Sequence, residues 1–146
     1  MLTIGHLFLN LRGFENLGGL LIYYLYPMDL IPKPELQQYL DKKAYLKKVL
    51  MQIHRDFEMA GCDFELPKNE IEELEELQNI LALNLEPLMK ENGPRLKNLL
   101  YRIDVSEKSI YKGMSENTDL QLAVLLRNKI IERELLKILI REKYSL

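Results

Sequence analysis

Apolar residues recur at steps of three and four along most of the chain, and this spacing restricts the fold more than any other feature of the sequence. Such steps place the residues on one face of an α-helix. No stretch alternates apolar and polar residues over strand length with the β-branched enrichment that strands require. The pattern therefore predicts an all-α fold, a helical bundle of four or five helices in which two intervening helices are short.

The first predicted helix starts at Pro34 and runs for about seven turns before Gly61 stops it. Proline suits the first helical turn, and glycine favours the left-handed backbone that ends a helix. Its apolar face comprises Leu36, Tyr39, Leu40, Leu46, Val49, Leu50, Ile53 and Phe57. The opposite face is basic and holds Lys42, Lys43, Lys47 and Lys48.

Prolines, glycines and capping residues divide the middle of the chain. Asn69 is predicted to cap a second helix, which Pro87 should end or kink. The Asn-Gly-Pro sequence at 92–94 predicts a firm break. Two short helices should follow, one over 95–103 and one that ends at Gly113, with Asp104 capping the second of them.

The last predicted helix runs over 119–143 and opens with a capping box of Thr118 and Gln121. It has apolar residues on more than one side. One stripe consists of Leu120, Val124, Ile131, Leu135 and Ile138, whereas Leu122, Leu125, Leu126, Leu136 and Ile140 point elsewhere. We expect a homodimer through this C-terminal helix, because symmetric dimers are the commonest assemblies. Complete burial within one chain is the alternative.

The N-terminal segment 1–27 differs in composition from 28–146, which we interpret as a single helical domain. The segment holds four of the seven glycines and only two charged side chains. Its longest apolar run, Leu20 to Tyr26, is far shorter than the about 20 residues that span a membrane, so we expect no transmembrane segment. Three interpretations stay open: packing against the domain, membrane contact through Phe8, Phe14 and the tyrosines, or translated sequence upstream of a start at Met28.

Charge and cysteine content exclude several classes of protein. The 20 basic and 22 acidic residues give a net charge of -2, which shows no bias toward nucleic acid or anionic membrane. The single Cys62 cannot form an internal disulfide, and with two histidines it cannot supply a zinc site without carboxylates. The common catalytic motifs are absent from the sequence. We therefore predict a cytoplasmic, non-enzymatic protein with no catalytic, cofactor-binding or metal residues.

Two constellations were weighed against this prediction. His54, Glu58 and Cys62 lie at four-residue steps and would share a helix face for a metal, provided that the helix continued past Gly61. As a nucleophile, Cys62 would need a histidine base, and its acidic surroundings should raise the thiol pKa. We interpret the histidine as an ordinary helix residue and the thiol as a buried one.

A second group combines residues of the short helices with the last helix. Arg102 is expected to pair with an acid of the last helix, where Glu132, Arg133 and Glu134 lie. Pairing and capping account for every member of this group, so we interpret it as architecture.

The run Leu-Leu-Tyr-Arg-Ile-Asp-Val-Ser-Glu at 99–107, with an apolar final helix that contains Ile130-Ile131-Glu132-Arg133, resembles small uncharacterised bacterial all-helical proteins. The resemblance covers about residues 95–143 and implies a helical fold in a bacterial cytoplasm, with no catalytic residue to transfer. Together these observations predict a small interaction or scaffold domain with an unidentified protein partner. The alternative is nucleic-acid binding through Lys42, Lys43, Lys47 and Lys48, together with Arg55.

Overall fold

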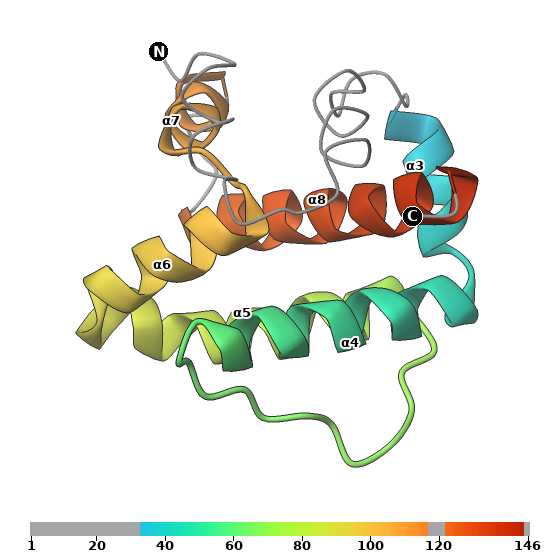
Figure 1. Cartoon of the computed structure of the whole chain (residues 1–146), viewed down its shortest axis with the longest axis horizontal. Coiled ribbons are helices and arrows are strands. Elements are labelled where there is room, and N and C mark those ends of the chain that lie inside the picture. The colour runs from blue at the N-terminus through green and yellow to red at the C-terminus, as the bar shows by residue number, and fades with distance from the viewer. Residues whose placement is uncertain (1–32, 117–121, 145–146) are drawn as a thin grey trace.

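A computed structural model describes residues 33–116 and 122–144, and these residues are helical with no strand among them (Figure 1). The predicted all-α fold is confirmed. The described helices are α3 (Lys33–Leu40), α4 (Lys43–Met59), α5 (Leu74–Glu91), α6 (Gly93–Ile103), α7 (Glu107–Glu116) and α8 (Leu122–Tyr144). Their number exceeds the predicted four or five because the first predicted helix is divided. Segment 1–27 and the Thr118–Gln121 capping box lie outside the described residues.

Helix α8 lies at the centre of the described structure and contacts each of the other five described helices. In Figure 1 it crosses above the layer formed by α4 and α5, while α3 and α7 lie toward its two ends on the other side. Helices α4 and α8 run antiparallel, because Lys48 pairs with Glu142 at one end and Asp56 with Lys137 further along. No helix within 33–116 or 122–144 has the length and apolar character needed to cross a bilayer.

The two-sided apolarity of α8 is explained by burial within one chain. Members of both predicted stripes are buried, including Leu135 and Ile138 from the first and Leu126, Leu136 and Ile140 from the second. The structure thus provides the alternative explanation, complete burial, for the feature that led us to expect a dimer through this helix. Leu122 is the exception, since it is 38% exposed at the start of α8.

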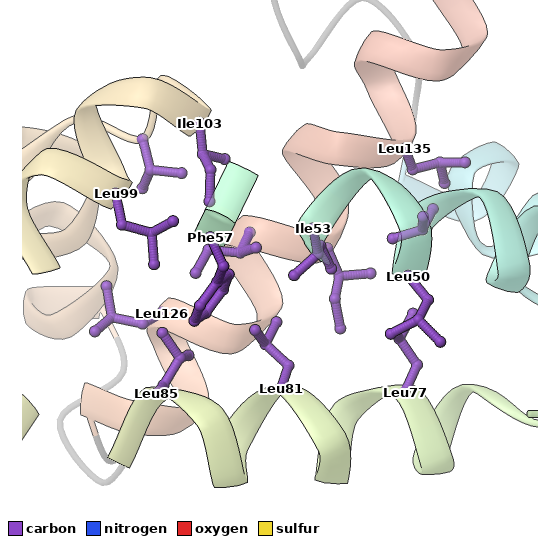
Figure 2. Packing of buried hydrophobic residues seen from close by; sticks show 14 of the residues in the cluster. Leu50, Ile53, Phe57, Leu77, Leu81, Leu85, Leu99, Ile103, Leu126 and Leu135 are labelled. Carbon is purple, nitrogen blue, oxygen red and sulfur yellow. The ribbon is translucent and has the colours of Figure 1, made fainter. Parts of the chain in front are cut away.

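The core lies between the α4–α5 layer, α6 and α8. Figure 2 shows Leu77, Leu81 and Leu85 of α5 pointing toward Ile53 and Phe57 of α4. All five are 0% exposed, and each fully buried side chain of this kind contributes about 1.5–3 kcal/mol. These residues are the ones whose helical spacing predicted the buried faces.

The first predicted helix is wrong as a single element, because the chain turns at Asp41 and Lys42. Lys42 has an extended backbone (φ -100°, ψ 122°) and precedes the first residue of α4. The turn brings Tyr39 edge-on to Tyr45, with ring centroids 5.0 Å apart, and lets α3 contact both α4 and α8. A continuous helix would carry Leu36 and Leu40 away from the core in which both are buried. The predicted stop at Gly61 is confirmed, since this residue has φ 74° just past the end of α4.

Helix α5 begins later and ends later than predicted. It starts at Leu74 rather than after Asn69, which leaves Glu70 and Glu72 free to pair with lysines of α4. It also continues through Pro87 to Glu91, so the predicted end there is wrong. Pro87 is exposed, and it cannot donate the backbone hydrogen bond that this turn of the helix would otherwise make. Packing of the buried leucines on either side keeps the helix continuous in spite of this loss.

The break at 92–94 is confirmed, because the Asn92 side chain caps α6 by accepting from the Arg95 N–H at 3.3 Å. The expected cap of α7 is wrong. Asp104 instead ends α6 in the left-handed conformation, with φ 72°. Ser106 caps α7, since its Oγ accepts from the Ser109 N–H at 3.0 Å. Helix α7 also continues beyond Gly113, where its end was predicted.

Candidate functional site

The basic face of α4 is neutralised by carboxylates from other segments. Lys43 lies 3.2 Å from Glu72, Lys47 lies 3.4 Å from Glu70, and Lys48 lies 3.3 Å from Glu142. Lys42 lies over the Tyr39 ring, 5.3 Å from its centroid. Tyr39 and Tyr45 pack against the core as expected. The ion pairs weaken the case for nucleic-acid binding through these lysines, which stays a prediction.

The structure separates the His54, Glu58 and Cys62 constellation. His54 Nε2 lies 3.3 Å from Glu58 Oε1, whereas Cys62 follows the turn at Gly61 and is buried. Its Sγ faces the carbonyl oxygens of Ala60 and Arg95, and burial raises the pKa of the thiol, with a smaller contribution from Asp63. No group of three or more metal-ligating side chains occurs within the described parts of the chain.

An ionic network joins α4, α6 and α8, and its members on α4 and α8 are largely buried whereas Arg102 of α6 reaches the surface. Asp56 of α4 is 3% exposed. Its Oδ1 accepts a hydrogen bond from Nε of Arg102 on α6 at 3.2 Å, and its Oδ2 lies 4.0 Å from Nζ of Lys137 on α8. Lys137 also donates to Oε1 of Glu134 at 3.1 Å. Three helices are therefore connected through one carboxylate.

Glu134 is the most deeply buried member of this network, at 0% exposure. Its Oε2 has no hydrogen-bond donor among its neighbours. Burial raises the pKa of Glu134 to about 8, and the nearby Asp56 carboxylate acts in the same direction although Lys137 opposes it. Protonation of Glu134 would give the unsatisfied oxygen a hydrogen to donate, and the Asp56 carboxylate is the acceptor beside it.

The sequence did not predict this network. Arg102 was expected to pair with an acid of the last helix, but it pairs with Asp56. Asp104, two residues further on, does pair with the last helix, since its Oδ2 accepts from Arg133 Nη2 at 2.6 Å. Asp56 lies three residues after Ile53 and directly before Phe57. This spacing places it next to the apolar face of the helix, so its burial could have been predicted from the sequence. Nothing in the sequence specified its partners.

The network connects three helices in the interior. Asp56, Glu134 and Cys62 line neither of two surface grooves in the described part of the chain. One groove lies between α5 and the start of α8, where Ala82, Leu83, Met89 and Ala123 form an apolar lining. The other lies between α4 and the end of α8 and is mainly basic.

Comparison with known protein families, with characterised proteins and with solved structures gives no match to this chain. The resemblance of 95–143 to small bacterial helical proteins therefore stays a prediction.

Proposed function

We propose that the protein is a non-enzymatic interaction domain that forms a homodimer through the groove between α5 and the start of α8. The observation that supports this most is Leu83, which is 69% exposed on a helix whose opposite face is fully buried. Leu122 at the start of α8 adds a second exposed leucine, at 38%. Large apolar side chains grouped at an apolar groove are typical of protein–protein contacts.

A second copy is the occupant that this surface fits best. Leu83 projects from α5 at the groove that it lines together with Ala82, Met89 and Ala123. A projection and an apolar depression on one surface can be self-complementary, as a two-fold dimer requires. The groove also has Glu86 and Lys90, which pair at 2.7 Å and leave no unbalanced charge to repel a second copy. The dimer would thus use the first turn of the C-terminal helix together with α5.

We place this domain in the cytoplasm, where its one free thiol stays reduced.

Sedimentation equilibrium over a wide concentration range tests the proposal. We expect the wild-type chain to approach twice the monomer mass, and Leu83→Ser to raise the dissociation constant at least tenfold. Leu66→Ser is the matched control, because Leu66 is another exposed leucine in the loop between α4 and α5. A wild-type chain that stays monomeric at millimolar concentration, or a dimer that is unaffected by Leu83→Ser, would overturn the proposal. Circular dichroism confirms that the variants remain helical.

A further inference from the structure

The groove between α4 and the C-terminal half of α8 combines an apolar floor with basic walls. Met51 of α4 is 48% exposed there, and Ile138 of α8, which is 7% exposed, lines the same groove. The α4 side of the groove extends from Ala44 to Glu58, a length of about 20 Å at 1.5 Å per helical residue. This length matches a partner helix of about four turns. Exposed methionine is suited to such a surface because its flexible thioether adapts to different apolar partners.

Two guanidinium groups at this groove have no ionic partner among residues 33–116 and 122–144. Arg55 of α4 and Arg141 of α8 both line it, and neither makes an ion pair or hydrogen bond within the described residues. The other charged groups of the lining are already matched, since Lys48 pairs with Glu142 and His54 with Glu58. The unbalanced charge of the groove is therefore concentrated on two side chains that can bind carboxylates in bidentate fashion.

We propose that the groove between α4 and α8 binds an amphipathic helix of another protein, with leucine-like side chains over Met51 and Ile138 and carboxylates on Arg55 and Arg141. Helix-in-groove recognition of this kind reads apolar anchors at helical spacing. The apolar floor favours a protein helix over nucleic acid, because a phosphate backbone leaves Met51 without an apolar contact. The basic walls favour an acidic helix over a neutral or basic one.

This inference is independent of the proposed dimer. Arg55 and Arg141 lie on α4 and at the end of α8, whereas Leu83 lies on α5 beside the start of α8. Loss of self-association in Leu83→Ser therefore leaves the α4–α8 groove unchanged. The two proposals can fail separately, since one is measured by mass and the other by peptide binding.

The test uses a fluorescent helical peptide of 18 or so residues, with leucines on one face flanked by glutamates, and a control peptide in which lysine replaces every glutamate. We expect the full chain to bind the acidic peptide at least tenfold more tightly than the basic one, as measured by fluorescence anisotropy. Replacement of both Arg55→Gln and Arg141→Gln should weaken binding of the acidic peptide at least tenfold. Lys68→Gln with Lys97→Gln removes the same charge elsewhere on the surface and should leave the affinity within twofold.

A further variant separates the groove from general attraction between opposite charges. Met51→Asp should abolish binding of the acidic peptide, because it removes the apolar floor and adds a like charge. Equal binding by the double arginine variant, or by Met51→Asp, would overturn the proposal. The proposal would also be overturned if a single-stranded oligonucleotide bound more tightly than the acidic peptide and the same arginine substitutions lowered the affinity for the oligonucleotide. The helical content of each variant is checked by circular dichroism.

Discussion

Helix α4 forms ion pairs on two sides, and the two sets differ in exposure. Lys43 and its partner Glu72 keep 51% and 70% of their side-chain surface in water, whereas Asp56 and Lys137 keep 4% and 17%. In water, an ion pair competes with hydration and is screened by salt, so it contributes little. In the interior, a missing partner leaves a charge without hydration. Removal of one partner should therefore destabilise the fold far more in the buried pair than in the exposed one.

The largest expected effect comes from breaking the buried network at its shared carboxylate. Asp56→Asn should lower the free energy of unfolding by about 3 kcal/mol, because Arg102 and Lys137 then lose their common counter-charge. Urea denaturation measures the difference. Glu58→Gln on the same helix is the control, and its exposed carboxylate should change stability by less than about 0.5 kcal/mol. Equal effects of the two variants would show that burial does not decide the value of these pairs.

The raised pKa of Glu134 should make stability depend on pH in a direction opposite to that of an ordinary carboxylate. The folded chain keeps the proton on Glu134 up to about pH 8, whereas the unfolded chain releases it near the ordinary value of 4.5. Between these values the folded state binds more protons, so stability falls as the pH rises. One such group contributes a slope of at most about 1.4 kcal/mol per pH unit. Urea denaturation at several pH values measures it.

Glu134→Gln provides the comparison for this pH effect. Its amide can donate to Asp56 in place of the protonated acid but cannot ionise. We expect the variant to match the wild type near pH 5 and to become the more stable of the two above pH 7. Parallel stability curves for the two proteins across this range would contradict the raised pKa of Glu134.

A smaller effect is expected at the partly buried pair of Asp104 and Arg133, whose side chains are 14% and 10% exposed. Asp104→Asn keeps a residue type that tolerates the left-handed backbone. The expected decrease of about 1–2 kcal/mol in the free energy of unfolding therefore measures the loss of the charge. Asp104→Ala should cost about 1 kcal/mol more, because alanine tolerates φ 72° poorly. Thermal unfolding ranks the stability of the two variants. If the alanine variant is as stable as the asparagine variant, the left-handed backbone makes no contribution to the difference.

The smallest effect is expected on the exposed side of α4. Lys43→Gln should change the free energy of unfolding by less than about 0.5 kcal/mol, and added salt should reduce even that difference. The same variant tests nucleic-acid binding through the lysine face. An oligonucleotide affinity that falls steeply with salt and weakens in Lys43→Gln would revive that alternative, whereas unchanged affinity would count against it.

The all-α fold and most of the core could be predicted from the sequence, because helical spacing fixes which residues share a face. Helical spacing predicted the burial of Ile53 and Phe57 on α4 and of Leu77, Leu81 and Leu85 on α5. The glycine at position 61 predicted the end of α4. These features depend on residues a few positions apart, where local geometry decides the outcome.

Only the tertiary structure decided the features that depend on distant segments. Two features contradict the local pattern, namely the turn at Asp41 and Lys42 and the continuation of α5 through Pro87. The pairing of Asp56 with Arg102 was not predicted by any local pattern. Packing overrides local preference at these positions, because burial of a helix face is worth more than one hydrogen bond or one cap. Which charges are buried together follows from the same packing, and a linear sequence does not specify it.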